Sequence, residues 1–581
     1  MHKMQLGPSW QILLFLTCLV RLCNGSEILL LISCPRQAAE HCRTWRDNLR
    51  QQQISDKIPK DYDYAIKVHI MHELFNYWTL LDALPYLRGK TRLLNANTDW
   101  IIWCQHNTHV ASLRGLLDQL HQRDAQEHQL FFLISFPFQL AYYGHALYDT
   151  EATIVHHFAN YKDPTWFPYP MLSAGVVFTG ALLRRLVELV ALNAPNATRH
   201  SEFAIDAAHE LARFIFDNIA PAGDGSGSSS SSGNGSNNVD SNISISKDDN
   251  DFVDMLQRKI ILKSADYICP WARVSAAWSL ASLETTAAAT AKESTPVSCV
   301  LHAKPEMAAG SAVHCVHTTG AHIYFAIKTC AKFHKERIPI IERTWAPDAI
   351  RRKYYSDVAD DGIPTTNTGL PNVLTGHCAK TLAILQLSLK DINELTDIRW
   401  LMLVDDDTLL SVPRLSKLLG CYNHTNHIYL GERYGYRLYA PDGFNYHTGG
   451  AGIVLSVPLL RLVVQRCSCP TASAPDDMIL GYCLQALGVT ATHVPALHQA
   501  RPQDYASELL QLNAPISFHK YWHTTPEHTY KRWLGGALGN ASSAHATAKD
   551  RRAAPLILNG LLQLPNQLPA GLEGPSKHLD L

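Results

Sequence analysis

The sequence lacks an excess of charge of either sign. Its 51 Lys and Arg residues nearly balance 52 Asp and Glu residues, for a formal net charge of −1. A protein that gathers nucleic acid or an anionic membrane surface needs a strongly basic field. The even balance therefore argues against a nucleic-acid partner.

Long apolar runs are absent after the N-terminus, since no later stretch reaches the roughly 18 uncharged apolar residues of a membrane span. Residues 1–26 have the pattern of a signal peptide, with Lys3 as a positive start, Trp10–Val20 as an apolar stretch and Asn24–Ser26 as a small-residue exit. A membrane anchor is the alternative, but about 11 apolar residues are too few to cross about 30 Å of hydrocarbon. We expect no stable membrane insertion after cleavage.

The cysteines and the two chain ends indicate an oxidising compartment. Of 14 cysteines, Cys18 and Cys23 leave with the signal peptide, and the remaining 12 suit a compartment where disulfides persist, although their pairing cannot be deduced. The last residues, His578–Leu581, share the acidic-then-Leu shape of an endoplasmic-reticulum retrieval address. An ordinary polar tail is the alternative. We expect residence in the lumen of the endoplasmic reticulum.

Residues that could build a core are scarce between 221 and 251, where Gly, Ser, Asn and Asp dominate. Such a segment cannot offset its own ordering entropy, so it is predicted to be a flexible insertion. A chain of 581 residues should hold two or more domains. The prediction is as follows: an N-terminal domain over 27–220, its remainder and a linker over 252–311, a second domain over 312–538, and a tail over 539–581.

Two segments of the N-terminal half reappear in the C-terminal half in the same order. Trp100–Thr108 aligns with Trp400–Thr408, and Ser173–Arg184 aligns with Gly450–Arg461. This indicates a duplicated domain; two unrelated strand-to-helix turns are the alternative. Where the second copy has Asp405, Asp406 and Asp407, the first copy has Gln105, His106 and Asn107. The first copy should therefore lack a metal site.

Strand and helix patterns alternate through the C-terminal half. Apolar strands are predicted at 322–327, 398–404, 428–431 and 452–456. Helices are predicted near 347–355, 376–390, 413–420 and 477–487. This alternation predicts an α/β fold around a largely parallel sheet.

The chemistry is expected at Asp405, Asp406 and Asp407, which directly follow the apolar strand Trp400–Val404. They therefore lie at the carboxyl end of a strand, where open α/β sheets bind ligands. Three adjacent carboxylates repel one another unless a cation neutralises them, and hard oxygen ligands suit Mg²⁺ or Mn²⁺ holding a diphosphate. A solvated acidic turn and a metal-dependent phosphohydrolase are the alternatives.

Other candidate residues lie further along the chain. Asp477, with Asp476 second, can serve as the general base that an acceptor hydroxyl needs, although both can also simply cap a helix. His519 is a candidate third metal ligand, with His498 as its rival. Gly449 and Gly450 are further candidates, because glycines allow close backbone approach to a sugar or phosphate. A simple turn is the alternative.

These motifs together resemble glycosyltransferase family 31, the Fringe-like β-1,3-transferases. The resemblance covers most of residues 320–525 and rests on Lys328-Thr329, Arg343-Thr344-Trp345, the Asp triplet, the Gly-rich turn and Pro475-Asp476-Asp477. It implies two GT-A-like (Fringe-like) domains, of which the N-terminal one is degenerate.

Longer runs, such as Gly431–Tyr436 and Ile516–Lys520, are similar to those family members that transfer glucose to O-linked fucose. The resemblance implies inverting transfer from UDP-glucose to the 3-hydroxyl of fucose on folded thrombospondin type 1 repeats. It implies that Asp407 and His519 bind Mn²⁺, that Asp405 and Asp406 face the nucleotide sugar, and that Asp477 deprotonates the acceptor. Four more residues would lie near the nucleotide: Lys328, Thr329, Arg343 and Trp345.

Two alternatives to this function remain. Another family 31 activity, with N-acetylglucosamine or galactose as the transferred sugar, would use the same motifs. A non-catalytic factor that binds glycosylated repeats for quality control is the alternative from a different class.

Overall fold

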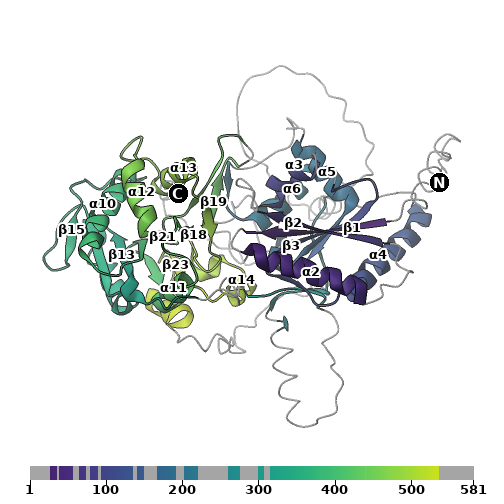
Figure 1. Ribbon diagram of the computed structural model, residues 1–581, viewed down its shortest axis with the longest axis horizontal. Coiled ribbons are helices and arrows are strands. Elements are labelled where there is room, and N and C mark those ends of the chain that lie inside the picture. The colour runs from purple at the N-terminus through teal and green to yellow at the C-terminus, as the bar shows by residue number, and fades with distance from the viewer. Residues whose placement is uncertain are drawn as a thin grey trace, which may run out of the picture.

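The computed structural model describes residues 26–35, 38–55, 64–72, 79–88, 93–134, 140–149, 166–191, 202–219, 259–271, 273–274, 299–305, 315–438, 440–521 and 523–535. Residues 1–25 of the expected signal peptide, the insertion over 221–251 and the tail over 539–581 lie outside these ranges. The described residues form two α/β bodies, one from each half of the chain (Figure 1).

The first body is built on a six-stranded sheet in the order β10-β5-β8-β3-β1-β2. Its strands are β1 (Ser26–Cys34), β2 (Tyr64–His72), β3 (Thr98–Gln105), β5 (Tyr142–Gly144), β8 (Val176–Thr179) and β10 (Lys263–Ser264). Its helices are α2 (Ala39–Ser55), α3 (Leu80–Arg88), α4 (Leu113–Ile134), α5 (Gly180–Ala191) and α6 (Ala207–Asn218). Successive residues of β1 enter two separate apolar clusters, Leu30 one and Leu31 the other, so both faces of the sheet are covered.

The second body is built on a seven-stranded sheet in the order β15-β14-β13-β16-β21-β18-β22. Its strands are β13 (Ile323–Lys328), β14 (Arg351–Ser356), β15 (Thr365–Asn367), β16 (Trp400–Asp405), β18 (Tyr429–Gly431), β21 (Ile453–Ser456) and β22 (Ala491–His493). Its main helices are α9 (Ile338–Arg343), α10 (Cys378–Glu394), α11 (Val412–Leu419), α12 (Val457–Arg466), α13 (Asp476–Ala486), α14 (Ser507–Leu512) and α15 (Pro526–Thr529). Both faces of this sheet are again buried.

The two sheets share one strand order. When the edge strand β15 is left out and the other strands of each sheet are numbered along the chain, β2-β1-β3-β8-β5-β10 and β14-β13-β16-β21-β18-β22 have the same order, 2-1-3-5-4-6. The central antiparallel pair also has the same register, because Trp100 lies opposite Thr179 and Trp400 lies opposite Ser456. Segments that resemble one another in sequence therefore occupy equivalent places.

The helix predicted over 347–355 is wrong. A short 3-10 turn, Ala346–Asp348, is followed directly by strand β14. Tyr354 and Tyr355 explain the strand, because adjacent residues of a strand face opposite ways, and these two rings enter the clusters on opposite faces of the sheet.

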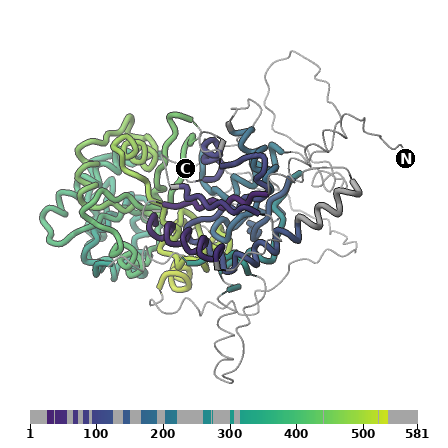
Figure 2. The backbone as a smooth tube through the Cα atoms, turned by 45° about the vertical axis from the view of Figure 1, so that its right-hand side comes forward, coloured from purple at the N-terminus to yellow at the C-terminus, as the bar shows by residue number. Residues whose placement is uncertain are grey.

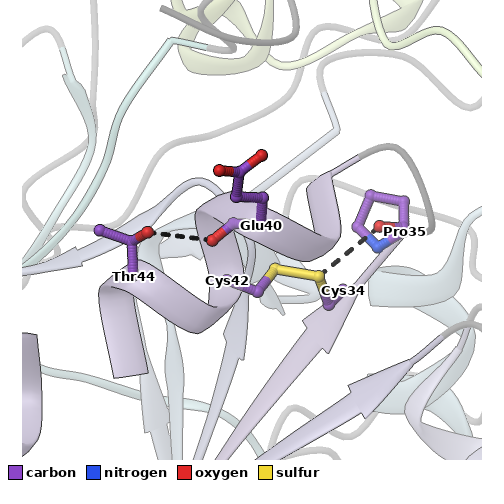
Figure 3. Close-up of a disulfide and its surroundings, with 5 residues drawn as sticks. All are labelled: Cys34, Pro35, Glu40, Cys42 and Thr44. Carbon is purple, nitrogen blue, oxygen red and sulfur yellow. Dashed lines mark hydrogen bonds between the residues drawn. A yellow bond between two sulfur atoms is a disulfide. The ribbon is translucent and has the colours of Figure 1, made fainter. Parts of the chain in front are cut away.

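Among the described residues, ten cysteines form five disulfides, and Cys104 and Cys330 are buried as free thiols. Figure 3 shows Cys34, at the end of β1, joined to Cys42 in α2. The other pairs are Cys269–Cys299, Cys315–Cys421, Cys378–Cys469 and Cys467–Cys483. The last two connect the start of α10 and the middle of α13 to the segment between α12 and α13.

Each half contributes an element to the other. Strand β9 (Phe203–Ala204), from the N-terminal half, pairs with β19 (Arg433–Tyr436), which in turn pairs with β20 (Phe444–His447). In return, Ala506 and Leu512 of the α14 region are buried in an apolar cluster of the N-terminal body. Figures 1 and 2 both show this yellow-green part of the chain beside the purple N-terminal half.

Among the described residues, no helix has the length and apolar character that a membrane crossing requires.

Candidate active site

Three potential metal ligands converge at the carboxyl end of β16. Asp405 is the last residue of this strand, and Asp407 precedes β17 (Thr408–Leu410), which pairs antiparallel with β23 (Ser517–His519). This pairing places Thr408 opposite His519. One ligand atom from each of Asp405, Asp407 and His519 lies within 4.8 Å of the others.

His519 points its Nε2 atom at both carboxylates. Nε2 lies 3.0 Å from Asp407 Oδ1 and 3.8 Å from Asp405 Oδ2. Its other ring nitrogen, Nδ1, lies 3.0 Å from the carbonyl oxygen of Gln499, which fixes the ring orientation as in many metal-binding histidines. Two carboxylates and an imidazole held in this way fit a divalent cation.

Opposite charges hold this cluster together. Burial alone would raise the pKa of Asp407, but the charge of His519 keeps this pKa below its usual value. Burial alone would lower the pKa of His519, yet Asp407 and Asp405 raise it. A bound cation would therefore displace a proton from His519.

The Gly-rich turn lies against this histidine. A Cβ atom on Gly450 would lie 2.3 Å from His519 Nδ1, so any side chain there would displace the ring. At Gly449 a Cβ would meet nothing within 4 Å. Gly450 is thus required by the close approach of His519, whereas the side-chain position of Gly449 is open.

Asp406 is the residue of the triplet that does not belong to this group of potential ligands. Its side chain accepts a hydrogen bond of 2.6 Å from the Thr329 hydroxyl and one of 2.7 Å from Arg337, and it is only 3% exposed. Burial and the neighbouring Asp407 raise its pKa to about 6. Arg337 also lies 3.2 Å from Asp407 Oδ2. Asp406 and Arg337 therefore help to hold the turn that carries Asp407.

Lys328 links this cluster to the Pro-Asp-Asp motif. Its Nζ lies 3.1 Å from Asp405 Oδ1 and 2.8 Å from Asp476 Oδ2. Thr381 donates a second hydrogen bond, of 2.6 Å, to the same Asp476 oxygen. Burial opposes ionisation of Asp476, but the Lys328 ammonium holds its pKa below the usual value. Asp476 is therefore held by an ammonium and a hydroxyl group, which makes it a weaker candidate for a proton acceptor.

Asp477 lies in the first turn of α13 in a different environment. Burial, together with the charge of Asp476, raises the pKa of Asp477 to about 7. The Met478 backbone N–H donates a 2.8 Å hydrogen bond to Asp477 Oδ1. A carboxyl group with a pKa near neutrality suits a general base. The pKa values of these adjacent aspartates move in opposite directions, so Asp477 is the better candidate for a general base.

Three sequence candidates do not join the cluster. Arg343 is more than half exposed and pairs with Glu527 at 2.8 Å. Trp345 is fully buried and donates to the Thr408 carbonyl at 3.0 Å, so it supports β17 from the core side. His498 stacks on Phe518.

Several supporting residues were not among the sequence candidates. Besides Arg337 and Thr381, Glu432 accepts a hydrogen bond from the Gln499 backbone N–H, and burial raises the pKa of Glu432 to about 8. Gln499 thus lies between Glu432 and His519. Glu432 could have been found from the sequence, because it lies in the Gly-rich, charged run Gly431–Tyr436. No sequence pattern marks Thr381 as a supporting residue.

Comparisons with known proteins agree with this geometry. Residues 318–532 match the Fringe-like family model. A β-1,3-glucosyltransferase of Mus musculus is 34% identical over 515 residues, which cover 88% of this chain and 87% of that protein. The Homo sapiens β-1,3-glucosyltransferase is 34% identical over 471 residues, covering 80% and 77%. A β-1,3-N-acetylglucosaminyltransferase, lunatic fringe of Xenopus laevis, is 29% identical over 31% of this chain and 56% of its own length.

The family model and these relatives confirm the family resemblance of the motifs. The chain is a UDP-sugar-dependent β-1,3-glycosyltransferase and belongs to the Fringe-like glycosyltransferases of family 31.

Proposed function

We propose that this enzyme transfers glucose from UDP-glucose, with inversion, to the 3-hydroxyl of O-linked fucose on folded thrombospondin type 1 repeats. The observation that carries the proposal is that Lys328 bridges Asp405 of the Asp405–Asp407–His519 cluster to Asp476, the neighbour of Asp477. Glucose as the transferred sugar is supported by the β-1,3-glucosyltransferases, which are similar over both halves of the chain.

Asp405, Asp407 and His519 are the residues that would hold the cation, for which we propose Mn²⁺, since it accepts carboxylate and imidazole ligands together. When bound, the cation offsets the charge that develops on the departing UDP. Lys328 adds a fixed positive charge on the side facing Asp476. Asp406 acts indirectly by holding Arg337 and Thr329.

Asp477 accepts the proton from the acceptor hydroxyl as the oxygen attacks the anomeric carbon. A base opposite the leaving diphosphate requires attack from the opposite face of the sugar, which inverts the anomeric configuration. Gly449 contributes a backbone N–H near Asp477, and the absence of a side chain there leaves space for a sugar.

We infer that the N-terminal body is a degenerate GT-A-like domain. Its strand order and central register match those of the catalytic body. At the position of the Asp triplet it has Gln105, His106 and Asn107, which leave a cation without carboxylate ligands. This supports one catalytic site per chain.

We propose that the enzyme works in the lumen of the endoplasmic reticulum. Five disulfides favour an oxidising compartment. The N-terminal signal pattern and the His578–Leu581 tail support the same location.

The second candidate donor is UDP-N-acetylglucosamine, which the similarity to lunatic fringe favours. The test is to incubate the purified full-length enzyme with a fucosylated, folded repeat and each of three donors: UDP-glucose, UDP-N-acetylglucosamine and UDP-galactose. The proposal expects a mass gain of one hexose with UDP-glucose and loss of that gain when the repeat carries no fucose. Transfer from another donor alone would contradict it.

A further inference from the structure

The segment that crosses from the N-terminal half reaches the catalytic body next to the general base. In β9, Ala204 pairs with Gly435 and Phe203 pairs with Tyr436. The Phe203 and Tyr436 rings lie 5.2 Å apart, and the Tyr436 hydroxyl donates to the Glu202 carboxylate at 3.1 Å. The junction therefore includes backbone pairing, ring packing and a polar contact.

This junction continues as far as α13. Phe203 packs with Tyr436 and Met478 around the buried aromatic residues of the β19–β20 hairpin. Met478 directly follows Asp477, and its backbone N–H donates to the Asp477 carboxylate at 2.8 Å. Helix α13 lies directly on β20, since a Cβ on Gly481 would lie 2.3 Å from Tyr446 Cβ. Phe203 of the N-terminal half and Met478, the neighbour of the proposed base, thus pack against the same aromatic cluster.

Part of this apolar surface is open to solvent. Tyr482 lies one helical turn after Met478, is 57% exposed, and contacts the Phe444 ring at 5.4 Å. We define the acceptor rim as Phe203, Tyr436, Phe444, Met478 and Tyr482. Of these residues Tyr482 is exposed, Phe203, Tyr436 and Met478 are half-buried, and Phe444 is buried. Aromatic and Met side chains are enriched at surfaces that bind another protein.

We propose that the acceptor rim binds the polypeptide around the acceptor fucose, so that the N-terminal half contributes directly to acceptor selection. This rests on the proposed function in taking a fucosylated, folded protein as the acceptor. A single fucose would occupy only the space next to Asp477, whereas a folded acceptor also presents protein surface, and Tyr482 is exposed five residues after Asp477 in the same helix. Residues 202–206 lie outside the stretch 318–532 that matches the Fringe-like family model. The rim therefore combines residues of the catalytic body with a segment that this family model does not include.

The test compares two acceptors in three variants of the full-length enzyme. Phe203→Leu and Tyr482→Ala alter the rim from each half of the chain. Ile350→Ala is the control, because Ile350 is 64% exposed and precedes β14, at the end of the parallel strands opposite the end that carries the Asp triplet. With saturating UDP-glucose, kcat and KM are measured for a fucosylated repeat and for a small aryl α-fucoside, alongside the thermal unfolding midpoint.

Both rim variants are expected to lower the ratio of the two kcat/KM values, repeat over fucoside, by about fivefold or more, mainly through KM for the repeat. The control should leave this ratio unchanged. An unchanged ratio in either rim variant overturns the inference, as does an equal loss with both acceptors, which would indicate a scaffolding role. Failure of the unaltered enzyme to use the fucosylated repeat would instead overturn the proposed function.

Discussion

The Nε2 atom of His519 lies 3.0 Å from Asp407 Oδ1, although the two residues come from distant parts of the sequence. The β17–β23 ladder, with Thr408 opposite His519, produces this contact. Because backbone hydrogen bonds and not side-chain flexibility set the distance, the cluster is preorganised for a cation.

Removing a ligand should abolish metal-dependent transfer. We expect Asp407→Ala and His519→Ala each to lower kcat/KM by more than about 100-fold, since a metal ion supplies several kcal/mol of charge stabilisation. Mn²⁺ binding, measured by titration calorimetry, should weaken in parallel. Asp397→Ala is the matched control, because Asp397 is an exposed carboxylate paired with Arg399. Full activity of the unaltered enzyme in excess chelator would contradict the metal assignment.

The two glycines of the turn offer a sharp comparison. Gly450→Ala places a methyl group 2.3 Å from His519 Nδ1, whereas Gly449→Ala meets nothing within 4 Å. We expect Mn²⁺ affinity to fall by about 10- to 100-fold in Gly450→Ala, as when residues that orient metal ligands are changed. Affinity should be unchanged in Gly449→Ala. Equal effects in the two variants would mean that His519 is not a ligand.

The pH dependence of transfer should report Asp477. Its pKa of about 7 means that the proton-accepting form is lost as the pH falls, so kcat/KM should drop about tenfold per pH unit below neutrality. Asp477→Asn should retain UDP binding, lose transfer by about 100-fold or more, and lack this acidic limb. A pH–rate profile of both forms measures this. An active Asp477→Asn enzyme would mean that another residue is the general base.

Lys328 should matter for stability as well as for the site. In Lys328→Met, two carboxylates lose their shared partner, and we expect a loss of about 3 kcal/mol in the free energy of unfolding at neutral pH. The pKa of Asp476 is lowered in the folded protein, so its contribution is present above its unfolded pKa and disappears as the pH falls through the folded pKa.

The stability difference between Lys328→Met and the unaltered enzyme should therefore be largest near neutrality and narrow below about pH 4. Urea unfolding at several pH values measures it, and Lys328→Arg serves as the charge-preserving control. A difference independent of pH would assign the loss to packing.

The sequence predicted the Asp triplet at a strand end because an apolar strand followed by carboxylates is a local pattern. It could not predict that Asp406 is turned inward, because that depends on Thr329 and Arg337, which arrive from another strand and loop. Trp345 was assigned to the nucleotide pocket by resemblance, yet its bulk fills the core under β17. Strand β9 is only two residues long and has no sequence periodicity to reveal it.

The exchange of elements between the halves has a consequence for how the molecule can be divided. Cutting the chain near residue 312 would remove β9 from the edge of β19. It would also expose Ala506 and Leu512, which are buried in the apolar cluster of the N-terminal body. Each fragment would then expose an unpaired strand edge or an apolar patch, both of which favour aggregation. The two bodies are therefore interdependent parts of one folding unit, and the smallest soluble form of this enzyme should include both.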